Sequence, residues 1–237
     1  MPTPGIPGTR SNRSGCADPY RRDTGPLSKR SKSMKVIGLT GGIASGKSTV
    51  STIFREDYRL PVIDADLLSR EAVLPGSPGM RQIETAFGRE VLLPDGSLNR
   101  SRMGELICDD SAVRDRLNAI LHPAIKDLYY ANLEMLKRDG KPLVIYDCPL
   151  LIEAGQRDEV DEVLLVVTDA QTRLKRIMER DGVDESLAKK KIEIQMPDEK
   201  KIELADTIIY NNGTLADLKN SLDFYMKEKL KNACIMS

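Results

Sequence analysis

The stretch GLTGGIASGKST, residues 38–49, determines the fold that we expect for this chain. It contains the pattern GxxxxGK[ST] at residues 41–48 and follows the short apolar run KVIGLT at residues 35–40. An apolar run that enters glycines is typical of a buried parallel strand, and the residues from Lys47 to about Phe54 are predicted to form a helix. A strand, a glycine-rich loop and a helix N-terminus in this order predict a phosphate-binding site.

Each residue type in the loop has a physical role. Glycines allow positive φ and let backbone amides approach an anion closely, and the helix N-terminus adds partial positive charge. Lys47 can reach the β- and γ-phosphates of a nucleotide, and the Ser48 hydroxyl can bind Mg²⁺. The residues predicted to hold a nucleoside triphosphate are Gly41, Gly42, Ile43, Ala44, Ser45, Gly46, Lys47 and Ser48.

The loop alone does not determine the reaction. The guanine-reading pattern NKxD and the switch pattern DxxG are absent from the chain, and so is the transporter pattern LSGGQ. These absences favour a kinase with a small acceptor over a GTPase switch or a transporter. Two alternatives stay open at this point: a kinase of the same fold that acts on another small acceptor, such as a nucleotide or nucleoside, and a catalytically weak nucleotide-binding regulatory module.

Acidic residues follow two further predicted strands. Asp64 and Asp66 end the stretch LPVIDAD, residues 60–66, and Asp147 follows the buried run at residues 143–146. Ligands of parallel sheets bind beyond the carboxyl ends of the strands, so Asp64 or Asp66 can accept or orient an acceptor hydroxyl. Asp147 is placed to be a second-shell magnesium ligand. The alternative is that Asp64 and Asp66 cap the next helix and that Asp147 caps a loop.

The remaining elements alternate between strands and helices. Helices are predicted at residues 67–74, at about 80–88, at 102–138 with a break near His122 and Pro123, at 171–204 and at 214–230, and further strands at 162–168 and 206–213. A turn is predicted at Asp95 and Gly96. This alternation is typical of an α/β fold with a parallel sheet that helices cover on both faces.

Three arginines recur on the predicted helix at 171–204. Arg173, Arg176 and Arg180 stand at i, i+3 and i+7, so they share one face. Such a face can stabilise the charge on a transferring phosphoryl group, and a solvated face with salt bridges is the alternative.

Composition excludes several classes of function. The 237 residues carry no net charge, so no overall field favours nucleic acid or a membrane surface. No stretch approaches the roughly 18 consecutive apolar residues of a membrane span. The four cysteines, Cys16, Cys108, Cys148 and Cys234, form no CxxC pair, which argues against a zinc site and a disulfide framework and favours a reducing cytoplasm.

The first 33 residues differ in composition from the rest. They are rich in Pro, Gly, Ser and Arg, and they carry seven Lys or Arg against two Asp. We expect either a disordered basic extension or a non-native start. They contain no apolar segment typical of a secretory signal. We therefore expect one domain at residues 34–237 and expect a chain that begins at Met34 to be as stable and active as the full one.

Several motifs in order resemble the dephospho-CoA kinase family. They are IGLTGGIASGKSTV, VIDADLLSREAV, PGSPG with FG and DGSLNR, LNAILHPAI, DCPLLIE, QTRLKRIMERDGV, IEIQ and LADTIIYNNGT. The resemblance covers about residues 35–220. It implies the P-loop kinase fold, which has a five-stranded parallel sheet, an acceptor-binding helical region at about 67–137 and a lid at about 171–204. It also implies transfer of the γ-phosphate of ATP, with Mg²⁺, to the 3′-hydroxyl of the dephospho-CoA ribose.

The resemblance also implies roles for individual residues. It adds Thr49 to the ATP-phosphate loop, makes Asp66 the acid beside the acceptor hydroxyl, and makes Arg176 and Arg180 the lid arginines that act with Lys47 in catalysis. The loop expected near adenine contains Asn211, Asn212 and Gly213, and the acceptor side includes Arg100, His122 and Pro123; Asp64 joins the acceptor side by its place at the end of a predicted strand. The chain departs from the family pattern at Asn99, where Asp is frequent, and at Lys191, where Arg is common. For His122, a bond to the backbone at a break between helices is the alternative.

Overall fold

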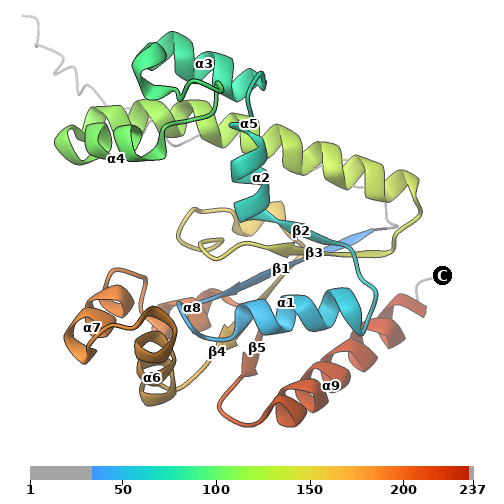
Figure 1. The fold of residues 1–237 in the computed structure, drawn as a ribbon. Coiled ribbons are helices and arrows are strands. Elements are labelled where there is room, and N and C mark those ends of the chain that lie inside the picture. The colour runs from blue at the N-terminus through green and yellow to red at the C-terminus, as the bar shows by residue number, and fades with distance from the viewer. Residues whose placement is uncertain (1–33, 235–237) are drawn as a thin grey trace, which may run out of the picture. The chain divides into compact units, whose positions relative to one another are not determined.

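A five-stranded parallel sheet forms the centre of the computed structural model, which describes residues 34–234 (Figure 1). The strand order is β2-β3-β1-β4-β5. The strands are β1 (Lys35–Gly41), β2 (Val62–Asp64), β3 (Leu143–Asp147), β4 (Glu162–Val167) and β5 (Thr207–Tyr210). The predicted five-stranded parallel sheet is therefore confirmed.

The register brings the ends of three strands to one edge of the sheet. Leu39 of β1 pairs with Asp147, the last residue of β3, and Gly41 pairs with Val166 near the end of β4. The loop after β1 therefore emerges between the carboxyl ends of its two neighbours, where ligands of such sheets bind.

Helices bury both faces of the sheet. On one face, α1 (Lys47–Glu56) and α9 (Leu215–Cys234) pack on β1, β3, β4 and β5, with Phe54 and Leu222 fully buried between them. On the other face, α2 (Ala65–Glu71) and the later part of α5 (Ser111–Arg138) cover a second cluster around Tyr129 and Tyr146. Burial on both faces explains why the central strands are almost purely apolar.

The region between β2 and β3 is helical and has a small core of its own. After α2 come α3 (Pro78–Phe87), a 3₁₀ turn at Arg89–Val91 and α4 (Arg100–Asp109), which leads into α5. The fully buried Ile83 and Val91 lie in this cluster. The predicted turn at Asp95 and Gly96 is confirmed, because Gly96 has φ +79° and its amide donates to the carbonyl of Leu93.

The helix break predicted at His122 and Pro123 is wrong. Helix α5 runs through Pro123 without interruption, although proline has no N–H to donate within a helix. The break lies instead at Asp110, whose side chain accepts a hydrogen bond from the amide of Ala112 and caps α5. Helix α5 contributes to two apolar clusters along its length, with Leu117 in one and Leu133 in the other, and this packing offsets the lost bond.

The predicted helical stretch at 171–204 consists of three helices. They are α6 (Ala170–Asp181), α7 (Glu185–Glu193) and α8 (Asp198–Leu204). Helix α6 ends at Gly182, which has φ +63°, and Asp184 caps α7. Pro197 immediately precedes α8. A second short 3₁₀ turn, Arg157–Glu159, precedes β4.

Helix α8 is fastened to the core by a buried ion pair. The Nζ atom of Lys201, a fully buried residue, lies 2.6 Å from Oε1 of Glu153 in the segment after β3. We predict that Lys201→Met lowers the free energy of unfolding by about 3 kcal/mol, because it leaves a largely buried carboxylate without its partner. Urea unfolding measures this value.

The double variant Lys201→Met, Glu153→Gln is the control for that prediction. It removes the unpaired charge, so it should recover part of the lost stability. A Lys201→Met protein as stable as the parent would show that the pair contributes nothing.

Some expectations lie outside the described residues. They concern the extension at residues 1–33, including Cys16, and the effect of removing it. Between residues 34 and 234, no helix has the length and apolar character needed to cross a membrane.

Candidate active site

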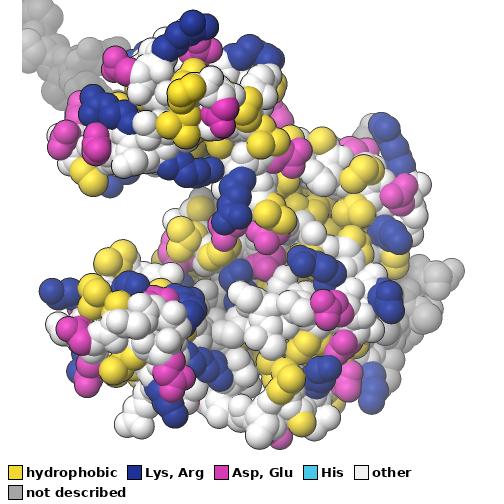
Figure 2. Space-filling view, in the orientation of Figure 1, with side chains coloured by type: hydrophobic (Ala, Val, Ile, Leu, Met, Phe, Trp, Pro, Cys, Tyr) yellow, Lys and Arg dark blue, Asp and Glu magenta, His cyan; other side chains and the backbone are white. Residues whose placement is uncertain are grey.

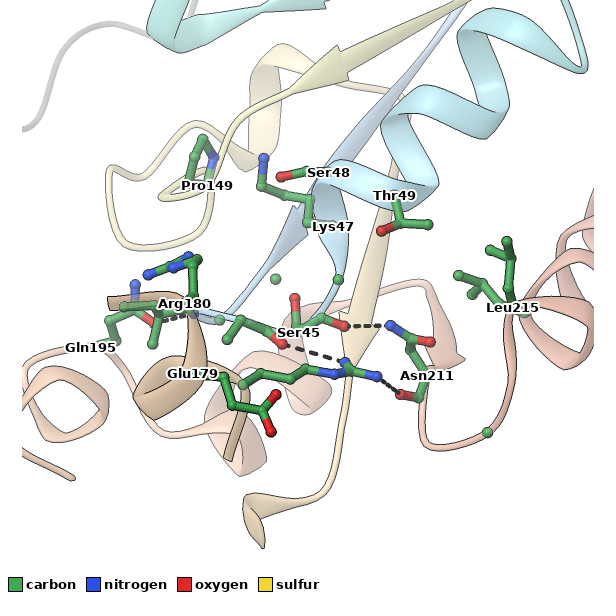
Figure 3. Close-up of a pocket in the computed structure, with 18 of the residues that line it drawn as sticks. Ser45, Lys47, Ser48, Thr49, Pro149, Glu179, Arg180, Gln195, Asn211 and Leu215 are labelled. Atoms are coloured by element: carbon green, nitrogen blue, oxygen red, sulfur yellow. Dashed lines mark hydrogen bonds between the residues drawn. The ribbon is translucent and has the colours of Figure 1, made fainter. Parts of the chain in front are cut away.

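A cavity of about 820 Å³ lies at the carboxyl edge of the sheet (Figure 3). The whole glycine loop, residues 41–49, forms one wall. In Figure 3, Arg180 and Gln195 lie on one side of the view, and Leu215 lies on the other, beyond Thr49 of the loop. The other lining residues are Asp66, Pro149, Arg176, Glu179, Asn211, Gly213 and Leu218.

The loop has the backbone geometry of an anion site. Gly46 is the N-cap residue of α1 in the left-handed region, with φ +93°, and within the described chain no side chain caps this helix. The first amides of α1 therefore stay available to a ligand, and the helix dipole favours an anion there. Glycine suits position 46 for two reasons. Its φ of +93° is unfavourable for residues with a side chain, and an added Cβ would lie 2.0 Å from Nδ2 of Asn211.

Lys47 and Asp147 form an ion pair at the end of β3. Asp147 is buried at 5% exposure and does not line the cavity, whereas Lys47 does. Parallel pairing of β1 with β3 brings these two side chains together, since Leu39 is opposite Asp147. The sequence assigned Lys47 to the nucleotide phosphates and Asp147 to a magnesium ion. In the structure the two side chains contact each other.

Asp64 and Asp66 have different environments. Asp64 is the N-cap of α2, and its Oδ1 accepts hydrogen bonds from the amides of Asp66 (2.9 Å) and Leu67 (3.1 Å). Asp64 is therefore the helix cap that was the alternative to an acceptor-binding role. Asp66 lies in the first turn of α2, exposed, and lines the same cavity as the loop. Only Asp66 of the two therefore faces a ligand in that cavity.

The three arginines of α6 do not act as one face. Arg176 and Arg180 line the cavity, but Arg173 is buried and pairs with Asp198 of α8. Arg176 donates from Nη2 to the carbonyl of Asn211 at 3.3 Å. The shared basic face is therefore wrong for Arg173, because tertiary contacts remove that residue from the cavity.

Arg180 is held by its neighbour Asp181. Hydrogen bonds from Arg180, and then from Lys191, hold the pKa of the Asp181 carboxyl well below its usual range. Lys191, one of the two departures from the family pattern, thus contacts Asp181 at 2.6 Å in this structure. Lys191 and Arg180 therefore share the carboxylate of Asp181.

The loop after β5 is fastened to its surroundings by two asparagines. The side chain of Asn211 donates to the carbonyl of Ser45 at 2.9 Å. Oδ1 of Asn212 accepts from the amide of Asp169 (2.8 Å) and from the hydroxyl of Thr168 (3.1 Å). Asn211 and Gly213 line the cavity, whereas Asn212 points its amide oxygen away toward α6.

Three predicted acceptor residues lie apart from the cavity wall. Arg100 begins α4, and His122 and Pro123 lie in the middle of α5; all three are exposed, and none lines the cavity. The structure therefore does not bring them to the loop. Sequence reasoning in turn missed Pro149, Glu179, Leu215 and Gln195 as lining residues. Three of them stand inside motifs that carry the family resemblance: Pro149 in DCPLLIE, Glu179 in QTRLKRIMERDGV and Gln195 in IEIQ; Leu215 carried no such signal.

Cys148, next to Asp147, gives a test of local burial. Burial raises the pKa of its thiol to about 11, so the thiol is protonated at neutral pH and a poor nucleophile. We predict that iodoacetamide at pH 8 leaves Cys148 unmodified in the native protein while it alkylates the exposed Cys108. Peptide mass mapping measures both, with a urea-unfolded sample as the control. Equal modification of the two in the native protein would contradict the prediction.

Comparisons with known proteins agree on one family. The model of the dephospho-CoA kinase family matches residues 35–217. A Geobacter sulfurreducens protein named dephospho-CoA kinase is 50% identical over 190 residues, covering 80% of this chain and 96% of that protein. A Bacillus cereus protein of the same name is 44% identical over 192 residues, covering 81% and 96%.

Solved structures agree as well. A Thermus thermophilus protein superposes with a TM-score of 0.69 at 31% identity, covering 83% of this chain and 98% of the other. A dephospho-CoA kinase from Campylobacter jejuni superposes with a TM-score of 0.65 at 25% identity, with the same two coverages.

Proposed function

Because this chain belongs to the dephospho-CoA kinase family and has its P-loop kinase fold, we propose that it transfers the γ-phosphate of ATP to the 3′-hydroxyl of the dephospho-CoA ribose. This reaction yields coenzyme A and ADP and is the last step of coenzyme A biosynthesis. The observation that carries the proposal is that the phosphate loop and the exposed Asp66 line one and the same cavity.

The loop residues 41–49 bind the phosphates of ATP. The uncapped amides at the start of α1 donate to phosphate oxygens, and Lys47 neutralises charge on the β- and γ-phosphates. Arg176 and Arg180 line the same cavity, and Nη1 of Arg176 lies beside the loop, 3.4 Å from the carbonyl oxygen of Ala44; their charge stabilises the transferring group. Asn211 and Gly213 border the nucleobase, with the exposed Leu215 beside them, and Asn212 holds their loop through its bond to the amide of Asp169.

Asp66 orients the acceptor hydroxyl and takes its proton. Catalysis of phosphoryl transfer depends mostly on positioning and charge stabilisation, so a carboxylate in the cavity of the phosphate loop is sufficient for this role. Asp64, which the sequence assigned to the acceptor side, supports Asp66 by capping the helix that carries it.

Mg²⁺ fits the residues of the loop. No group of three or more His, Cys, Asp or Glu that could hold a metal occurs among residues 34–234, whereas Mg²⁺ is usually bound through one or two protein groups and substrate phosphates. The exposed hydroxyl of Ser48 would hold it directly, and Asp147 would stand behind it. When bound, Mg²⁺ supplies positive charge that offsets the charge of the phosphates.

The acceptor binds toward the helical region at about 67–137. Figure 2 shows a hollow between the region of α3 and α4 and that of α6 and α7, with Lys and Arg side chains along its border. Arg100, His122 and Pro123 belong to this region, and we assign them to the acceptor rather than to the chemistry. The lid at about 171–204 closes from the opposite side, and the cytoplasm is the compartment that we propose.

A panel of acceptors tests the function. ADP release is measured in a coupled assay with dephospho-CoA, nucleoside monophosphates, nucleosides and shikimate as acceptors. We expect dephospho-CoA to stimulate ADP release. We also expect the product to carry the new phosphate on the 3′-oxygen, which phosphorus NMR of the product measures. Release that follows a nucleoside monophosphate would overturn the proposal in favour of another kinase, and release that no acceptor stimulates would favour a regulatory module.

A further inference from the structure

Arg173 lies behind the phosphate-binding loop, outside the cavity. Its side chain is 7% exposed, and its guanidinium donates to the two oxygens of Asp198 at 2.8 and 3.2 Å. The remaining Nε donates to the backbone carbonyl of Ile43 at 2.9 Å. Asp198 therefore neutralises this arginine, and its bonds serve the loop and not a ligand phosphate.

The guanidinium also packs directly on the loop. A Cβ added at Gly42 would lie 1.5 Å from Nη2 of Arg173, a distance that no side chain tolerates. Glycine at position 42 thus allows the arginine, and not only an anion, to approach the backbone.

Ile43 is held from both sides. Its carbonyl accepts from Arg173, and its amide donates to Oε1 of Gln195 at 2.7 Å. The next residue, Ala44, has φ +59°, a left-handed conformation that a residue with a side chain keeps only where its surroundings hold it. The loop therefore takes its shape partly from side chains of the segment at 171–204.

We propose that Arg173 is a positioning residue, which sets the phosphate-binding loop in the shape that receives ATP by joining Ile43 to Asp198. Gln195 completes the arrangement from the other side of the same residue. The proposal rests on the proposed function only in taking ATP as the ligand of the loop, and it does not depend on the acceptor. Its effect reaches ATP through the loop, whereas Arg176 and Arg180 line the cavity themselves.

The test measures nucleotide binding without an acceptor. Isothermal titration gives the dissociation constants of Mg-ATP and of ADP for the parent, for Arg173→Lys and for Asp198→Asn. Lysine keeps the charge but loses the bidentate fork. We expect the dissociation constant of ATP to rise about tenfold in Arg173→Lys, the loss typical of one charge-assisted hydrogen bond. In a separate assay of the full reaction, the KM of Arg173→Lys for dephospho-CoA should stay within about twofold of the parent value, because the substitution leaves the acceptor side unchanged.

A second Arg–Asp pair provides the matched control. Arg157 donates to both oxygens of Asp206 at 2.9 and 2.7 Å. Asp206 binds the amide of Val163, near the start of β4 and far from its carboxyl end. Arg157→Lys breaks a pair of the same two residue types, but its side chains are 40% and 42% exposed, so we expect a smaller fall in melting temperature and no change in ATP affinity.

Three results decide the proposal. A double variant Arg173→Lys, Asp198→Asn that binds ATP no more weakly than Arg173→Lys alone supports the bridge, because the two residues then act as one unit. An ATP affinity of Arg173→Lys equal to that of Arg157→Lys overturns it. If Arg173→Lys does not fold, Asp198→Asn alone decides, and parent-like ATP binding in that variant overturns the proposal. Failure of the parent to phosphorylate dephospho-CoA would count against the function but not against this bridge.

Discussion

Replacing Lys47 with alanine is expected to lower turnover by about three orders of magnitude, the upper range for the loss of one group that stabilises transition-state charge. Lys47 is the lysine of the phosphate loop, and it lines the cavity beside the start of α1. The ADP-release assay measures the rate, and titration with Mg-ATP measures the accompanying loss of affinity.

The pairing of Lys47 with Asp147 complicates this experiment. Alanine leaves a carboxylate of 5% exposure without its partner, so the variant also loses stability. Lys47→Arg separates the two effects, because it keeps a positive charge for Asp147 but moves that charge relative to the phosphates. We expect near-parental melting and a large loss of rate in Lys47→Arg. Turnover within tenfold of the parent in both variants would remove Lys47 from catalysis.

Asp66→Asn should produce the second large loss, about 10²- to 10⁴-fold in turnover, the range for removal of a general base. Asparagine has nearly the same shape but cannot take a proton, and Asp66 accepts no hydrogen bond that caps α2, since Asp64 has that role. ATP affinity should therefore remain close to that of the parent, while kcat falls.

Glu56→Gln is the control for Asp66→Asn. It neutralises an exposed carboxylate at the last residue of α1, at the opposite end of that helix from the loop. Its turnover should equal that of the parent. Near-normal turnover in Asp66→Asn would exclude a base role and leave Asp66 as a residue that only orients the hydroxyl.

Local signals predicted correctly the sheet and the strand, glycine loop and helix at residues 35–56. The apolar runs around Leu39, Val144 and Leu164 are short and enter turns or acidic residues, as buried parallel strands do. The loop needed no tertiary information, because its glycines, its lysine and the helix that follows are contiguous. The position of Asp66 at the carboxyl edge of the sheet could be predicted for the same reason, since Asp66 follows the end of β2 by two residues.

Features that depend on distant contacts were not predictable. The pattern His122-Pro123 has a strong local signal for a break, but packing on two apolar clusters keeps α5 in one piece. Arg173 and Arg176 are equivalent by helical spacing, and only the position of Asp198 on another helix separates the buried one from the one in the cavity. No local pattern in the sequence predicts that Arg173 pairs with Asp198.

The place of β1 in the sheet has a consequence for how this protein folds. Lys35 pairs with Leu143 and Ile37 pairs with Glu162, so both partner strands follow β1 by about a hundred residues or more. The first strand to be synthesised is therefore among the last to gain its hydrogen-bonded neighbours. During synthesis, the glycine loop leaves the ribosome long before either neighbour exists, and its apolar strand waits without a partner. A fragment that ends before Glu162 contains every residue of the glycine loop yet lacks one of the two strands between which that loop emerges.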